Sequence, residues 1–240
     1  MSRDERYRPG LTWSLLLVRI PQLVLAVLAL WWMWNTERFF SLRNLGQIVN
    51  LASLVGVLAV GQAFVLIGGG FDLSQGAVLG LSAACAAAWV QDDSLGPFGG
   101  AVVALSVGLL IGLVNGFFVA YVRTNAFVTT LSMTLVVRGL TFLRLGGRMI
   151  GPVETFEPLA RRVSVGRLPV SGLSVTFLVA VVVAWALLRK TVFGQHLYAT
   201  GGNAQAARLA GVRTGRLRMA SFALSGAAAG LAAILWLAFL

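Results

Sequence analysis

The sequence has few of the residues on which soluble proteins and enzymes rely. Charged residues make up 11% of its 240 residues, whereas a soluble globular chain carries roughly 25%. A single cysteine, Cys85, excludes a disulfide framework, and a single histidine, His196, gives a metal site little support. The Gly-x4-Gly-Lys-Ser/Thr phosphate loop is missing, which excludes ATP hydrolysis by that motif. We therefore expect no catalytic residue, no metal and no cofactor.

What the sequence has instead is long hydrophobic runs. Apolar residues make up 58% of the chain and lie in stretches of about twenty residues between short charged clusters. A helix of that length crosses a hydrocarbon core about 30 Å thick, and it satisfies its own backbone polar groups in lipid. The sequence therefore predicts an all-α, polytopic transmembrane bundle with about seven spans, at residues 11–34, 45–67, 73–89, 98–122, 127–145, 170–188 and 217–240.

Acidic residues are also scarce, with eight Asp and Glu against nineteen Lys and Arg. The resulting net charge of +11 does not indicate nucleic-acid binding, because membrane proteins concentrate basic residues in their cytoplasmic loops. A cytoplasmic N-terminus places Arg123 and the basic loop 189–216 inside, and it places the Asp92-Asp93 turn outside. The segment 146–169 then lies outside, and its prolines prevent one continuous helix.

The most informative stretch is residues 68–76, Gly-Gly-Gly-Phe-Asp-Leu-Ser-Gln-Gly. Three glycines after an apolar run end a helix, and Asp72 or Ser74 is suited to cap the next one. An acidic residue near membrane depth is costly and usually functional, and transporters place helix breaks near their substrate path. A plain turn with a helix cap explains the same residues, and the spacing alone leaves both interpretations open.

Small residues recur at intervals of four along several of the runs. Gly108, Gly112 and Gly116 share one helix face, which lets two membrane helices approach closely. The pairs Gly76 with Gly80 and Gly226 with Gly230 repeat the pattern. Asn115 is suited either to an interhelical hydrogen bond or to a polar pathway, and Arg138 either ends its helix or has an interior structural role.

A short helix is predicted between Gly202 and Gly211 in the most basic loop. Asn203 is a good N-cap, alanine and leucine favour helix, and Gly211 suits the position just after the end. Too short to cross a membrane, this helix is suited either to docking a soluble partner or to lying against anionic headgroups.

These residues resemble those of a known family. The run 69–76 is similar to the GG-hydrophobic-DLS-x-G signature of ribose/xylose-type sugar permeases, the membrane subunits of bacterial ABC importers within the branched-chain amino acid/monosaccharide permease superfamily. Further blocks resembling this family follow in its order, between about residues 44 and 233, at 114–116, 126–131, 138–139, 193–203 and 206–212.

The resemblance implies a single permease domain over residues 1–240, of the type II importer class, with a cytoplasmic coupling loop at 189–216. It implies that Asp72 and Ser74 belong to an element near the pathway or gate, and we take Gly70 and Asn115 as further candidates for that pathway. It also implies that the helix coupling the chain to an ATPase comprises Gly202, Asn203, Ala206, Ala207, Arg208, Leu209 and Gly211.

The partners implied by the resemblance are a cytoplasmic ATP-binding subunit, a second permease copy and an extracytoplasmic solute-binding protein, in a bacterial inner membrane. The expected cargo is a monosaccharide or a similar small polar solute. Members of the family continue past the position of Leu240, so we expect a C-terminally truncated permease whose transport competence is in question. An ion-coupled secondary transporter and a membrane-embedded enzyme remain alternatives. The first would need more intramembrane carboxylates than the sequence has, and the second would need a catalytic cluster, which the sequence does not show.

Overall fold

A computed structural model describes residues 10–92, 96–151, 153–165 and 168–240. The chain forms two units, residues 1–45 and 46–240, which are described separately. In the first unit, α1 (Gly10–Asn35) is a long helix that contains Pro21 and exposes Trp31, Trp32 and Trp34. A short turn follows it, in which the Asn44 amide donates to the Phe39 carbonyl at 2.7 Å.

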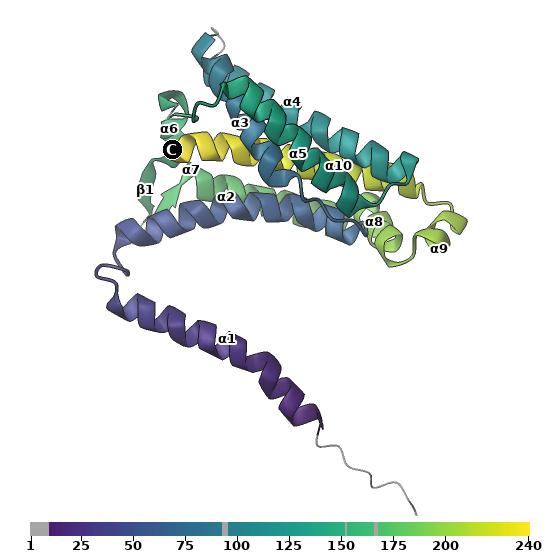
Figure 1. Ribbon diagram of the computed structural model, residues 1–240, viewed down its shortest axis with the longest axis horizontal. Coiled ribbons are helices and arrows are strands. Elements are labelled where there is room, and N and C mark those ends of the chain that lie inside the picture. The colour runs from purple at the N-terminus through teal and green to yellow at the C-terminus, as the bar shows by residue number, and fades with distance from the viewer. Residues whose placement is uncertain (1–9, 93–95, 152, 166–167) are drawn as a thin grey trace, which may run out of the picture. The chain divides into compact units, whose positions relative to one another are not determined.

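The second unit is a helical bundle with one small hairpin (Figure 1). Its helix α10 runs between α2 on one side and α3, α4 and α5 on the other (Figure 1). The short helix α6 and the hairpin lie at one end of the bundle, and α8 and α9 lie at the other (Figure 1). The elements are α2 (Leu42–Ile67), α3 (Gln75–Asp92), α4 (Gly96–Phe117), η1 (Phe118–Val122), α5 (Ala126–Leu145), η2 (Glu154–Phe156), α6 (Glu157–Ala160), β1 (Arg162–Val165), β2 (Leu168–Ser171), α7 (Gly172–Lys190), α8 (Val192–Gly202), α9 (Ala204–Leu209) and α10 (Thr214–Phe239).

Among the described residues, five helical stretches are long and apolar enough to cross a membrane. They are Leu42–Ile67, Gly96–Val122, Ala126–Leu145, Gly172–Lys190 and Thr214–Phe239. The all-α prediction is confirmed, and five of about seven predicted spans are supported. The predicted spans at 11–34 and 73–89 correspond to helices α1 and α3, and their crossing of the membrane stays a prediction.

Helices α4 and α10 pack together through the predicted glycine face. A β-carbon on Gly108 would overlap the Gly226 carbonyl oxygen, and one on Gly112 would overlap the Phe222 carbonyl oxygen. The backbones therefore touch directly, which gives dispersion contacts that larger residues would prevent. The pair Gly76 and Gly80 behaves differently, because no atom of the described residues lies within 4 Å of a β-carbon on either glycine.

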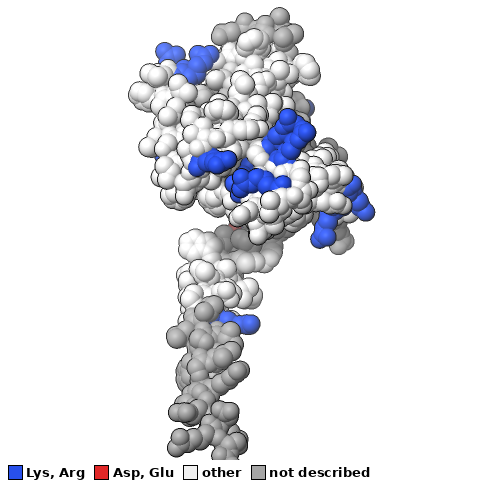
Figure 2. Space-filling view, turned by 90° about the vertical axis from the view of Figure 1, so that its right-hand side faces the viewer, with Lys and Arg blue, Asp and Glu red and all other residues white. Residues whose placement is uncertain are grey.

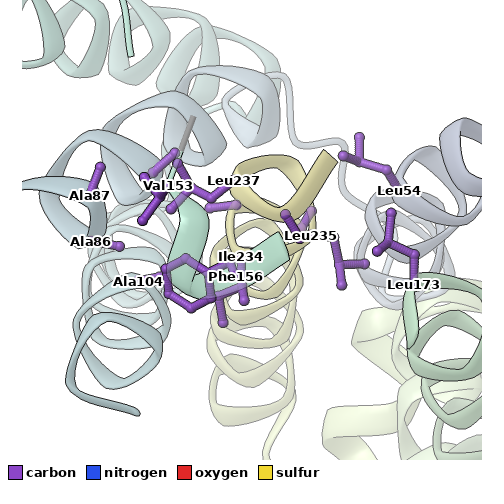
Figure 3. Close-up of a cluster of buried hydrophobic side chains, with 14 of the residues drawn as sticks. Leu54, Ala86, Ala87, Ala104, Val153, Phe156, Leu173, Ile234, Leu235 and Leu237 are labelled. Carbon is purple, nitrogen blue, oxygen red and sulfur yellow. The ribbon is translucent and has the colours of Figure 1, made fainter. Parts of the chain in front are cut away.

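The largest apolar core lies beside α10, toward the hairpin end of the bundle (Figure 3). Phe156 and Val153, from the segment after α5, contact alanines of α3 and α4 and leucines of α10. Leu54 of α2 and Leu173 of α7 extend this core on the far side of Leu235 (Figure 3). The packed residues of α10 make it the most buried span, with 67% of its apolar window inside the bundle.

The described residues of the segment 146–169 do not form one continuous helix, as the prolines predict. Pro158 lies in the first turn of α6, a position that tolerates a missing N–H. Strands β1 and β2 pair antiparallel, with Arg162 opposite Ser171. The bundle is thus not purely helical, and Phe156, at 2% exposure, anchors this segment in the core. The predicted Asp93 turn and Pro152 lie outside the described residues.

Candidate functional site

The glycine run ends helix α2 by a specific hydrogen-bond pattern. Gly69 has a φ of +79°, a left-handed conformation that favours glycine. The Gly70 N–H donates to the Val65 carbonyl at 2.9 Å, and the Gly69 N–H donates to the Leu66 carbonyl at 3.0 Å. This is the Schellman arrangement, which satisfies carbonyls that a helix end leaves unpaired. The predicted stop is confirmed, and an unwound strip, residues 68–74, joins α2 to α3.

Asp72 lies at the centre of a buried polar network. One carboxylate oxygen accepts from the Ser74 hydroxyl at 2.6 Å and from the Ser74 N–H at 2.9 Å. The other accepts from the hydroxyl of Ser225 in α10 at 2.6 Å. Asp72 is 6% exposed, so these bonds replace the water that a buried carboxylate loses. In this network the carboxylate accepts no N–H from within α3. Its bonds join the residues before α3 to α10, which a helix cap does not do.

Two further amides complete the network. Gln75 donates to the Ser225 hydroxyl at 2.8 Å and to the Leu58 carbonyl of α2 at 3.2 Å. Asn115 of α4 donates to the Ser74 hydroxyl at 2.9 Å, so its bond joins a helix to the unwound strip rather than to another helix. The carbonyl oxygen of Asn115 is buried and has no hydrogen-bond partner among the described residues. The network therefore joins α2, α3, α4 and α10 through the unwound strip.

The backbone of the strip is held by the neighbouring helices. The Leu73 N–H donates to the hydroxyl of Thr130 in α5 at 3.1 Å, and the Leu73 carbonyl accepts from Thr134 at 3.1 Å. In the amide orientation that satisfies both groups, Gln62 of α2 donates to the Asp72 carbonyl at 3.1 Å and accepts from its N–H at 3.3 Å. Side chains thus take the place of the helical bonds that the strip lacks.

A cavity of about 630 Å³ opens beside this strip, where α2 and η1 end and α5 and α10 begin. Gly70 lines it, whereas Asp72, Ser74 and Asn115 do not. Its cationic lining side chains are Arg123, Arg208 and Arg218. Viewed toward α8 and α9, this end of the bundle carries many Lys and Arg residues and scarcely any Asp or Glu (Figure 2).

Helix α9 has the capped form that the sequence predicts. The Asn203 side chain accepts from the N–H groups of Gln205 at 3.0 Å and Ala206 at 2.9 Å. At the other end Gly211 has a φ of +85°, and the Val212 N–H donates to the Ala207 carbonyl at 3.0 Å. Gly201 does not end the preceding helix, because α8 continues through Gly202 and has Asn203 as its C-cap.

The surface of α9 is divided between packing and solvent. Ala207 is buried, while Leu209 is 86% exposed and Ala206 and Arg208 are also exposed. Leu209 is therefore accessible at the end of the helix. Ala206, Arg208 and Leu209 are thus exposed on α9, whereas Gly202 belongs to α8 and Ala207 is buried. The coupling role of these residues stays a prediction.

Several residues of the network escaped the sequence reasoning. Ser225, Thr130 and Thr134 lie in apolar runs, and a hydroxyl there forms interhelical bonds. Arg138 does not end its helix, since α5 continues to Leu145, and its exposed side chain lines a second cavity of about 390 Å³ with Gly76 and Gly80. Cys85 is half-buried.

Comparison with known proteins agrees with this architecture. The model of the family described as branched-chain amino acid transport system / permease component matches residues 44–240. The chain belongs to this permease family. The permease is 34% identical to the ribose import permease protein of Haemophilus influenzae over 82% of its own length, and to that of Escherichia coli K12 over 83%. It is 35% identical to the autoinducer 2 import system permease protein of Yersinia pestis over 83% of its length.

The permease spans 61% of the Haemophilus protein, 63% of the Escherichia coli protein and 56% of the Yersinia protein. No solved structure matches it. Family membership confirms the resemblance carried by residues 69–76 and by the blocks that follow them. The matched region contains the unwound strip, the arginine-lined cavity and α9.

Proposed function

We propose that this chain is the membrane-spanning permease subunit of an ABC importer for a monosaccharide or a similar small polar solute, driven by a separate cytoplasmic ATPase. The relatives named for ribose and autoinducer 2 import support this class of solute. The proposal includes a second permease copy and an extracytoplasmic solute-binding protein as further components. It places the multi-pass chain in a bacterial inner membrane with its N-terminus in the cytoplasm.

The observation that carries the proposal is the geometry of α9. Its two ends are closed by side-chain and backbone hydrogen bonds, so the helix is rigid although it has only six residues. Leu209 is 86% exposed at its tip, and Lys and Arg residues gather at this end of the bundle (Figure 2). A rigid, capped element with an apolar tip is suited to transmit force from a soluble subunit, because little of the movement is lost in bending.

The unwound strip is proposed as the element that responds to this force. Gly70 lines the cavity next to Arg208 of α9, and the strip continues into the network of Asp72, Ser74 and Asn115. A shift of α9 or of α10 therefore reaches a segment held by a few hydrogen bonds rather than by a helical ladder. Such a segment has the discrete alternative arrangements that a gate requires.

The docking role is tested by the double variant Ala206→Asp with Leu209→Asp, because both side chains are exposed and two carboxylates oppose burial in an apolar interface. We expect loss of co-purification with a co-expressed ATP-binding subunit from the same organism, while membrane insertion is unchanged. Gln195→Asp is the matched control, because Gln195 is exposed on the neighbouring helix α8. Retained association in the double variant would reject the docking role.

A further inference from the structure

The arginine side chains that line the cavity have no carboxylate partner among the described residues. Arg218 in α10 has a buried Nε that finds no hydrogen-bond partner among the described residues. Arg123 and Arg208 line the same cavity, and no described carboxylate lies within ion-pair distance of any of the three guanidinium groups. The sequence itself contains no Asp or Glu after Glu157, so acidic residues are missing from both α9 and α10.

The backbone around the cavity adds to this demand. Helix α10 begins at Thr214 without a side-chain cap, and both Thr214 and Gly215 line the cavity. The first N–H groups of a 26-residue helix carry a partial positive charge and favour an anion. Arg218 reaches the glycine turn as well, because its Nη2 lies 4.0 Å from the place of a β-carbon on Gly69. The arginine side chains and the N-terminus of α10 therefore both make the cavity electrically positive.

The position of the cavity selects the kind of anion. It lies at the ends of the spans Leu42–Ile67, Gly96–Val122, Ala126–Leu145 and Thr214–Phe239, which is the level of lipid headgroups. Three aromatic side chains of its lining, Phe71, Tyr121 and Phe127, are 42–54% exposed. A water-soluble anion gains nothing from exposed rings, whereas acyl chains pack against them.

We propose that this cavity binds the phosphate of an anionic phospholipid, with Arg123 and Arg218 as its principal ligands and the acyl chains against the exposed rings. Basic pockets between membrane helices on the cytoplasmic side are suited to anionic headgroups. The bound lipid joins the end of α2, the beginning of α5 and the beginning of α10, the elements that hold the unwound strip. It thereby stabilises one position of the strip.

The test measures thermal unfolding of the purified chain in detergent with dioctanoyl phosphatidylglycerol or dioctanoyl phosphatidylcholine. We expect only phosphatidylglycerol to raise the unfolding midpoint. Arg123→Asn with Arg218→Gln removes two ligands, and we expect its affinity for phosphatidylglycerol to fall at least about tenfold. Arg213→Gln with Arg216→Gln is the matched control, because these exposed arginines lie at the same end but outside the cavity. The control retains the affinity of the wild type.

Each other outcome overturns the proposal. Equal stabilisation by both lipids, or an equal loss in the control variant, excludes a specific phosphate site. Glycerol phosphate or inorganic phosphate that binds as tightly as the lipid makes this a site for a soluble anion. An unchanged lipid affinity with lost ATPase binding assigns the arginines to an acidic protein partner. If the double variant does not fold, the affinity for phosphatidylglycerol is measured with Arg123→Asn alone. This variant is expected to fold, because Arg123 is exposed and asparagine tolerates its φ of +63°.

Discussion

At the scale of single residues, Asp72 shows how a carboxylate is kept in an apolar bundle. Its two oxygens receive hydrogen bonds from Ser74 and Ser225, and the described residues place no cation within ion-pair distance. Hydroxyl donors supply this stabilisation without the desolvation of a second charge. The stability of the carboxylate therefore depends on helices that are far apart in the sequence.

Replacing Asp72 with asparagine tests this dependence. The amide keeps one acceptor oxygen but points an N–H₂ group at a hydroxyl that now donates, so one buried bond is lost. We expect a loss of about 1–3 kcal/mol in the free energy of unfolding, and impaired solute uptake or assembly with the ATPase. Thermal unfolding in detergent measures the first and vesicle uptake the second. Wild-type values for both would reduce Asp72 to a simple turn residue.

The glycines of α4 give a second prediction at this scale. Gly112→Ala forces a β-carbon against the Phe222 carbonyl, and overpacking of this kind costs about 1–3 kcal/mol. Gly80→Ala is the matched control, because its β-carbon meets open space and alanine favours helix by up to about 1 kcal/mol. We expect the unfolding midpoint to fall for the first variant and to hold or rise for the second. Equal effects would contradict direct contact between α4 and α10.

At the scale of elements, the caps of α9 determine whether this short helix exists. A six-residue helix is too short to be stable by its own propensity. Asn203 satisfies two N–H groups at its start, and Gly211 closes its end in a conformation strained for other residues. The helix therefore depends on two residues that lie outside it.

Asn203→Ala is expected to cost about 1 kcal/mol locally. Hydrogen exchange of the amides between residues 204 and 209 reports this loss of stability. We expect the exchange to be severalfold faster than in the wild type. Gly202→Ala is the control, since a β-carbon there meets no atom of the described residues within 4 Å. An unchanged exchange rate in Asn203→Ala would show that packing through Ala207, rather than capping, holds the helix.

The elements also separate what the sequence predicts from what it does not. Stops at Gly69 and Gly211 were predictable because a left-handed residue after a helix calls for glycine. The bonds from Ser225 and Thr134 to the strip were not, because they join residues 153 and 61 positions apart and their hydroxyls look like ordinary members of apolar runs. The cavity escaped prediction for the same reason, since Arg123, Arg208 and Arg218 meet only in the folded bundle.

At the scale of the whole molecule, the orientation in the membrane follows from the distribution of charge. Basic residues collect at the end that carries α8 and α9 (Figure 2), which predicts a cytoplasmic position for that end. The opposite end carries α6 and the hairpin, which then lie outside.

Labelling with a membrane-impermeant maleimide tests this orientation in a Cys85→Ala background. Met149 is 94% exposed after α5, and Leu209 is 86% exposed on α9. We expect Met149→Cys to react in intact cells and Leu209→Cys to react only after permeabilisation. The reverse pattern would invert the orientation, and reaction of both in intact cells would mean that the number of spans between them is wrong.

The burial of α10 has a consequence for the order of assembly during synthesis. This helix follows α2–α7 along the chain, yet it supplies the glycine face for α4, the serine for Asp72 and much of the apolar core. Before α10 inserts, α4 lacks its glycine-packed partner, and the Asp72 oxygen that accepts from Ser225 lacks that donor. We therefore expect a chain that stalls before α10 inserts to be less stable in the membrane than the folded bundle.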